Sequence, residues 1–247
     1  QRLSALPIII HLLHRKDACR LDIRWLRLHH LASKRVLLIG IPSGLQNAIF
    51  AVANLFVQAG LNSFDEITVS GAAAAANADT LVFNMMAAFY TACASFVSRN
   101  WGAGRKERIL KSFHIFTLYG IFTVLVGVLL TVFGREFLGL FADKPEVIDA
   151  GVDRLRIMAF SYWLGPLMDA SIAASRGLGR SVAPTIMVIL GSCVFRVIWI
   201  YTIFAYFHTI ASLYLLYMFS WILTGVAEYI YFRITYKRNV LTARATW

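Results

Sequence analysis

Six long apolar stretches constrain this chain more than any other feature. Each is close to or above the roughly 20 residues that a helix needs to cross about 30 Å of hydrocarbon. Composition agrees, because 59% of the 247 residues are hydrophobic and only 15% are charged, which is more apolar than a soluble domain. We therefore predict an all-α, polytopic membrane helix bundle with six transmembrane helices, at Val36–Gly60, Ile67–Val97, Phe113–Phe133, Ile157–Ser175, Val182–Phe207 and Ile210–Phe232.

The rest of the chain is short and basic. Leu3–Leu13 is an apolar run of about half a span, without the basic start and cleavage site of a signal peptide. We expect residues 1–13 to be the tail of a truncated preceding transmembrane helix and residues 14–35 a basic cytoplasmic linker. The six helices then occupy residues 36–232, and residues 233–247 form a basic cytoplasmic tail.

The distribution of lysine and arginine predicts the orientation of the chain. Nineteen of the 24 lie before the first span, in the loops 99–111 and 176–180, or after the last span. Loops rich in these residues stay cytoplasmic, so we expect both ends of the chain in the cytoplasm of a cell (inner) membrane. Anionic lipid favours such segments, and the net charge of +11 therefore predicts contact with membrane lipid and no nucleic-acid partner. The residues assigned to the opposite face are Arg135, Lys144, Arg154 and Arg156.

Ionisable residues inside spans are costly and commonly functional. Asp79 follows Asn77 in the second span, with Asn84 further along, and we take it as an unpaired carboxylate that exchanges a proton or binds sodium. The alternative is a purely structural polar network. Asp169 lies near the cytoplasmic end of the fourth span, where water can reach it, so a structural and a functional role are equally compatible with its position. We expect Glu228 to snorkel or to pair with Arg233.

Arg196 lies deep in the fifth span and requires a carboxylate, carbonyls or water around its charge. In the first span, Asn54, Gln58 and Asn62 are four residues apart and share one helical face. They can join helices or line a substrate path, and we favour the path for Asn54 and Gln58.

Prolines and cysteines carry structural expectations only. Pro42 and Pro166 are expected to kink the first and fourth spans. Three widely separated cysteines predict neither disulfides nor a zinc site, and we interpret Cys19, Cys93 and Cys193 as packing residues.

Taken in order, several short motifs resemble the second half of multidrug and toxic compound extrusion (MATE) transporters, from about Leu3 onward. Two departures stand out: Asp79 replaces a usual glutamate, and Arg99 a usual glutamine. The motifs are Gly40-Ile-Pro42, Gly44-Leu45-Gln46-Asn47, Val57-Gln58, Leu61-Asn62, Ala74-Ala75-Ala76-Asn77 before Asp79, Met86 to Tyr90, Ser98-Arg99-Asn100-Trp101-Gly102-Ala103-Gly104, Arg176-Gly177-Leu178-Gly179 and Gly191-Ser192-Cys193-Val194-Phe195-Arg196.

The resemblance implies twelve helices in two lobes around a central cavity, of which this chain is the C-terminal lobe. It implies export of organic, often cationic compounds driven by sodium or proton entry, with further coupling acids in an N-terminal lobe that this chain lacks. We expect no cofactor, and no metal beyond a possible sodium ion at Asp79. We assign ion or proton coupling to Asp79 and Asn77, and the substrate cavity to Asn54, Gln58, Asn62, Asn84, Arg196 and Asp169.

Two alternatives stay open. A lipid-linked oligosaccharide flippase of related architecture is expected to have a large cationic cavity, and Arg196 is the only basic residue that the sequence places deep inside a span. An intramembrane enzyme needs a nucleophile and base or a metal cluster in facing spans, and the sequence has no HExxH motif or persuasive aspartate pair. We therefore expect a transporter and no enzyme.

Overall fold

The computed structural model describes residues 2–17, 21–22 and 27–241, and no strand occurs among them. The chain divides into two compact units, residues 1–40 and 41–247. In the first unit, α1 (Arg2–His14) covers the apolar run that was expected to be a helix tail. The helix α2 (His30–Leu61) begins in this unit, six residues before the predicted first span.

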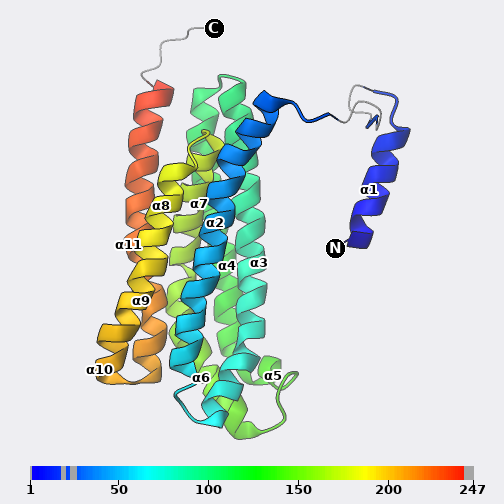
Figure 1. Cartoon of the computed structure of the whole chain (residues 1–247). Helices are drawn as coiled ribbons and strands as arrows, with labels where there is room; N and C mark the ends of the chain where they lie inside the picture. Colours follow the sequence, from blue (N-terminus) through cyan, green and yellow to red (C-terminus); the bar gives the residue numbers. More distant parts are fainter. Residues whose placement is uncertain (1, 18–20, 23–26, 242–247) are drawn as a thin grey trace. The chain divides into compact units, whose positions relative to one another are not determined.

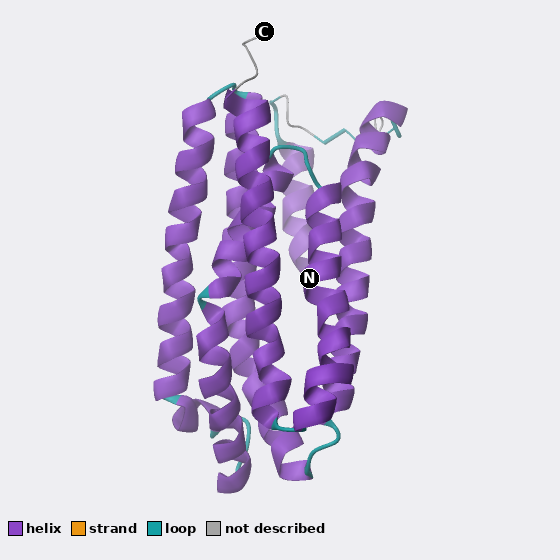
Figure 2. Cartoon of the chain, turned by 90° about the vertical axis from the view of Figure 1, so that its left-hand side faces the viewer, coloured by secondary structure: helices purple, strands orange, loops and turns teal. Residues whose placement is uncertain are grey.

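The second unit is a bundle of long helices that run roughly parallel to one another (Figures 1 and 2). After α2 it contains α3 (Glu66–Gly102), α4 (Lys106–Val132) and, last, α11 (Ile210–Thr235). Within the described residues, these four and the continuous helical segment Val182–Phe207 are long and apolar enough to cross a membrane. Five of the six predicted spans are therefore confirmed as single helical stretches.

The remaining predicted span, the fourth (Ile157–Ser175), is covered by two helices rather than one. They are α6 (Pro145–Tyr162) and α7 (Leu164–Gly177), which are separated at Trp163. Pro166 has no backbone N–H to donate to the carbonyl one turn earlier, so the hydrogen-bond ladder is interrupted there. In contrast, α2 continues through Pro42 without a break. A short helix, α5 (Gly134–Leu138), precedes α6.

The segment Val182–Phe207 alternates between α-helical and π-helical turns. It comprises α8 (Val182–Val188), a π turn at Ile189–Val194, α9 (Phe195–Trp199), a second π turn at Ile200–Phe204 and α10 (Ala205–Phe207). Such wider turns are rare and are frequent at functional sites. The short helix α9 between them carries Arg196.

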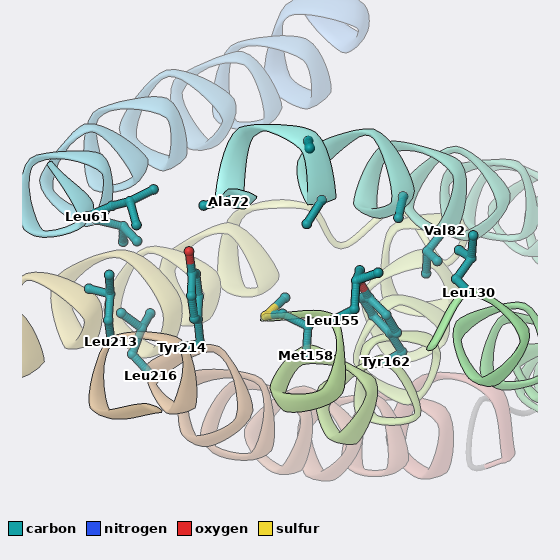
Figure 3. Packing of buried hydrophobic residues seen from close by; sticks show 14 of the residues in the cluster. Leu61, Ala72, Val82, Leu130, Leu155, Met158, Tyr162, Leu213, Tyr214 and Leu216 are labelled. Atoms are coloured by element: carbon teal, nitrogen blue, oxygen red, sulfur yellow. The ribbon is translucent and has the colours of Figure 1, made fainter. Parts of the chain in front are cut away.

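Small residues allow α3 to pack closely against its neighbours. A Cβ atom on Gly71 would lie 2.6 Å from the carbonyl oxygen of Val147 in α6, so only glycine fits. Small side chains of this kind permit close contact between membrane helices. Figure 3 shows the apolar core between these helices, with Val82, Leu130 and Tyr162 close together.

The two ends of the bundle differ in charge. One end, which we call the basic end, holds the turns 103–105 and 178–181, and the other, the acidic end, holds the connections 62–65, 133–144 and 208–209. In Figure 1 the basic end is at the top and the acidic end at the bottom. At the acidic end Asp65 caps α3 by accepting from the backbone N–H of Thr68. Successive connections therefore alternate between the two ends of the bundle, as the predicted spans require.

Candidate functional site

Asp79 lies inside the bundle and is ion-paired. It is 6% exposed, and the Nη2 atom of Arg154 in α6 donates to one of its carboxylate oxygens. The hydroxyl of Tyr162 donates to the other carboxylate oxygen. The prediction that Asp79 is an unpaired acid is therefore wrong, and so is the assignment of Arg154 to a loop face.

Further contacts hold the Arg154 guanidinium in place. Its Nη1 atom donates to the carbonyl oxygen of Ala72 at 3.0 Å, and its Cζ atom lies 5.0 Å from the ring centroid of Tyr214 in α11. Arg154 is itself only 9% exposed. A buried ion pair of this kind depends on both partners, because loss of either leaves an uncompensated charge in the apolar interior. We call Asp79, Arg154, Tyr162 and Tyr214 the Asp79 cluster.

The sequence contains a signal for Arg154 that the loop assignment missed. The buried residues Val147, Gly151, Met158 and Ser161 are spaced four, seven and three residues apart in α6. Arg154 falls within this series, three residues after Gly151 and four before Met158. Helical periodicity places such positions on one face, so Arg154 belongs to the face that packs on α3.

Asn77 and Asn84 lie away from the Asp79 cluster. Both side chains are exposed, and the Asn77 amide donates to the carbonyl oxygen of Ala74 in its own helix at 3.1 Å. Two residues along a helix correspond to about 200° of rotation, which explains why Asp79 and Asn77 face different sides. The structure does not bring them together, and their shared coupling role stays a prediction.

Arg196 and Asn54, both assigned to the substrate cavity, contact each other, and their role in substrate binding stays a prediction. The Arg196 Nη1 atom donates to Asn54 Oδ1 at 3.0 Å, and the guanidinium lies 4.5 Å from the ring centroids of both Phe50 and Tyr217. Arg196 is fully buried. Its Nε and Nη2 atoms have no hydrogen-bond partner among the described residues.

The other two amides of the predicted polar face, Gln58 and Asn62, bond to each other and not to Arg196. Gln58 and Asn62 are exposed, and the Gln58 amide donates to Asn62 Oδ1 at 2.9 Å. The polar face of α2 is therefore divided: Asn54 contacts the buried Arg196, whereas Gln58 and Asn62 are exposed.

A third polar cluster surrounds Arg176 near the basic end, and sequence reasoning missed it. The guanidinium donates to the Tyr90 hydroxyl at 2.8 Å, to Gln46 Oε1 at 2.7 Å and to the Thr185 hydroxyl at 3.3 Å. These contacts join α7 to α3, α2 and α8. With Arg154 and Arg176 both inside the bundle, the prediction that Arg196 is the only deep basic residue is wrong. The distribution of basic residues had assigned Arg176 to a cytoplasmic loop.

Two acids lie in this half of the bundle. Asp169 is half-buried and lines a pocket of about 10 Å³ with Tyr90, Cys93 and Phe116, which is room for roughly one water molecule. Glu228 is fully buried, and neither carboxylate oxygen has a hydrogen-bond partner within the described part of the chain. The expected pairing of Glu228 with Arg233 is wrong, because the Arg233 guanidinium stacks on the Tyr229 ring at 5.9 Å.

The described ranges contain no group of three or more histidine, cysteine and acidic side chains that could hold a metal ion. Cys93 and Cys193 are free and buried, as expected for packing residues, and Cys19 lies outside the described residues. At Asp79, Arg154 and Tyr162 already contact both carboxylate oxygens. A sodium ion there would have to displace them or share the carboxylate with a guanidinium.

Helices long and apolar enough to cross a membrane, with several ionisable side chains buried between them, define a membrane protein with a functional polar interior. The MatE family model matches residues 42–202, which include Asp79, Arg154, Arg176 and Arg196. The chain belongs to the MatE family.

Relatives and solved structures agree on the fold. The chain is 24% identical over 164 residues to the probable multidrug resistance protein NorM of Thermotoga maritima, covering 63% of this chain and 34% of that protein. It is 27% identical over 131 residues to the probable multidrug resistance protein YpnP of Bacillus subtilis, covering 53% and 29%. An outward-facing multidrug resistance MATE family transporter of the MOP superfamily superposes with a TM-score of 0.81 at 18% identity, over 96% of this chain and 54% of that one.

The chain thus spans about a third of the length of these two curated relatives and about half of the solved transporter. The solved transporters have the twelve-helix fold, and this chain matches one six-helix half of it.

Proposed function

We propose that this chain is one lobe of a cation-coupled antiporter that exports organic, often cationic compounds by alternating access. The observation that carries the proposal is the buried Asp79 cluster in a membrane bundle of the MatE family. The relatives described as multidrug resistance proteins support the substrate class. A second six-helix lobe completes the transporter, and the basic end of the bundle faces the cytoplasm.

Asp79 is the coupling residue in this proposal. Coupled export requires the ion and the substrate to favour different conformations, because a ligand shifts an equilibrium only by its differential affinity. The carboxylate is held between α3 and α6 by Arg154 and Tyr162. Loss of its negative charge removes the attraction that joins these helices, so ion binding at Asp79 changes how they pack.

The geometry favours a proton over sodium as the ion at Asp79. A proton neutralises the carboxylate and needs no further ligands, whereas a cation would be repelled by the Arg154 guanidinium beside it. In this proposal Asn54 and Arg196, which are hydrogen-bonded to each other, shape a polar part of the substrate cavity. We assign the exposed amides of Gln58, Asn62 and Asn84 to the substrate cavity as well.

Dye efflux by the full-length protein in efflux-deficient cells tests this function. The cells are loaded with ethidium, and efflux is followed with and without an ionophore that collapses the proton gradient. We expect the wild-type protein to export ethidium and the ionophore to stop it. Asp79→Asn is expected to lose the dependence on the gradient.

Because Asp79→Asn also leaves Arg154 without its charged partner, a second variant separates coupling from folding. The double variant Asp79→Asn with Arg154→Gln removes both charges and keeps similar side-chain volumes. If it restores expression but not gradient-driven efflux, Asp79 acts in coupling. Full gradient-driven efflux by the double variant would show that the pair is structural only and would refute the coupling role.

A further inference from the structure

Glu228 presents the most unusual electrostatic environment outside the Asp79 cluster. It lies on α11, one turn after Thr224, and is fully buried. Neither of its carboxylate oxygens accepts a hydrogen bond from the described residues. Most buried side-chain polar atoms have at least one hydrogen-bond partner, so two bare oxygens on one acid require an explanation.

The helices around Glu228 supply few charges. From α7, the guanidinium of Arg176 acts on it electrostatically. Asp169 of α7 and Glu228 both act electrostatically on the hydroxyl of Tyr90 in α3, as does Arg176. On α11 itself, Arg233 is engaged with the ring of Tyr229.

Among the other segments packed against α11, α6 and α9 carry Arg154 and Arg196, which are engaged with Asp79 and Asn54. The α8 segment and the π turn after it contain no charged residue, and Cys193 in that turn faces Arg196. The last helical turn of the described chain carries Lys237 and Arg238. Arg176 is thus the cation within the bundle that acts on Glu228.

Arg176 does not bond to Glu228 in this structure. Its two terminal nitrogens donate to Tyr90, Gln46 and Thr185, and its Nε atom has no partner among the residues described. An ionised carboxylate in an apolar interior without hydrogen bonds is far more costly than the neutral acid. The geometry therefore fits a Glu228 that carries a proton.

We propose that Glu228 is a second proton-binding residue of this lobe, with Arg176 as the partner of its ionised form. This inference rests on the proposed export function, because it assigns to the same transporter a proton site near the basic end. On release, the O–H bond of the carboxylic acid breaks and the proton passes to water. Arg176 keeps its charge throughout and neutralises the carboxylate that remains.

A small pocket lies beside two side chains of this cluster, although Glu228 itself does not line it. It is lined by Asp169 and Tyr90 and has room for roughly one water molecule. Tyr90 also accepts a hydrogen bond from Arg176. A water molecule in this pocket would lie next to the side chains that surround Glu228, between α3, α4 and α7.

Ionisation of Glu228 also affects α2. Attraction to a carboxylate draws the Arg176 guanidinium toward α11 and away from Gln46 of α2. Most of α2 is exposed, so this hydrogen bond is one of the few polar contacts that hold it. Proton release at Glu228 therefore loosens α2 from α7, which couples the site to a helix that can move.

Infrared difference spectroscopy on the full-length protein in lipid vesicles tests the proposal. A protonated buried carboxylic acid gives a C=O stretching band distinct from carboxylates and amides, and the band is followed as the pH is raised. We expect a band at neutral pH that is lost at higher pH, and loss of its Glu228 component in Glu228→Gln, where any component from protonated Asp79 remains. The matched control Glu146→Gln removes an exposed carboxyl and is expected to keep the band.

A further variant keeps the proposal testable if Glu228→Gln does not fold. Arg176→Gln removes the cation that stabilises ionised Glu228, so the band is expected to persist to higher pH than in the wild type. A band that is absent from the wild type, unchanged in Glu228→Gln or unmoved in Arg176→Gln would overturn the proposal.

The same vesicles separate the two claims. The band is measured without substrate or gradient and so does not depend on export. If the wild type shows the band, Glu228→Gln loses it, and the wild type exports no ethidium, the export function is refuted and the proton site stands. Efflux without the band would refute the proton site alone.

Discussion

Replacing Asp79 with leucine should destabilise the bundle strongly, because it removes one partner of a buried ion pair. Arg154 would keep its hydrogen bond to the Ala72 carbonyl and its contact with the Tyr214 ring, but its charge would have no counter-ion. Breaking a buried pair in this way costs about 3–5 kcal/mol. Asp79→Asn should cost less, because the amide oxygen can still accept from Arg154.

The loss can be measured by thermal unfolding of the purified full-length protein in detergent. For a domain of this size, 1 kcal/mol corresponds to roughly 2–4 °C in Tm, so Asp79→Leu is expected to lower Tm by about 6–20 °C. The double variant Asp79→Leu with Arg154→Met removes both charges. It should recover most of the loss, because apolar replacement of a whole buried pair is often neutral or stabilising.

The double-mutant cycle decides whether the pair exists. Residues in direct contact show coupling energies of about 0.5–3 kcal/mol, and the recovery expected in the double variant places this buried pair at or above the upper end of that range. If the Tm losses of Asp79→Leu and Arg154→Met simply add in the double variant, the two side chains do not interact and the assignment is refuted.

Three further predictions concern packing, capping and the second buried arginine. Gly71→Leu should destabilise the protein by about 1–3 kcal/mol, because the larger side chain overpacks against Val147. The control Ala73→Leu, on the exposed side of the same helix, should have little effect on Tm. Equal Tm losses in the two variants would contradict the packing. Hydrogen bonds from Thr68 lower the pKa of Asp65, so its contribution to stability is present above its ordinary value of about 3.9 and is lost as the pH falls through the lowered pKa. The Tm difference between wild type and Asp65→Asn should therefore shrink in acid, and a difference that grows would refute the cap. Arg196→Lys should lower Tm, because an ammonium group cannot stack between the Phe50 and Tyr217 rings as a guanidinium does, and an unchanged Tm would contradict this.

The sequence predicts most of the fold because the bilayer imposes a simple rule. Runs such as Phe113–Phe133 are apolar for the length that a membrane requires, and the structure has a single helix over that run. The rule fails at Ile157–Ser175, because residues of α6 such as Asp153 and Arg156 are charged and look like a loop. Their helix nevertheless continues the bundle, and only the break at Trp163 marks the boundary.

The candidate site is less predictable, because side-chain partners come from distant parts of the chain. Asp79 and Arg196 are visible as charges in apolar runs, but the hydrogen bond between Arg196 and Asn54 was not predicted. The partner of Asp79 is 75 residues away. Arg154 was counted with the loop charges, although helical spacing places it on the buried face of α6. For Glu228, no pattern in the sequence distinguishes a snorkelling residue from a fully buried acid.

The central claim is that proton binding at Asp79 drives export through a bundle that the Asp79–Arg154 pair holds together. The most direct measurement is ethidium transport by the full-length protein in proteoliposomes with an imposed pH gradient and no other energy source. We predict gradient-driven transport by the wild type, and no response to the gradient in the variant that combines Asp79→Asn with Arg154→Gln. Transport in that variant at the wild-type rate, with the same dependence on the gradient, would contradict the account.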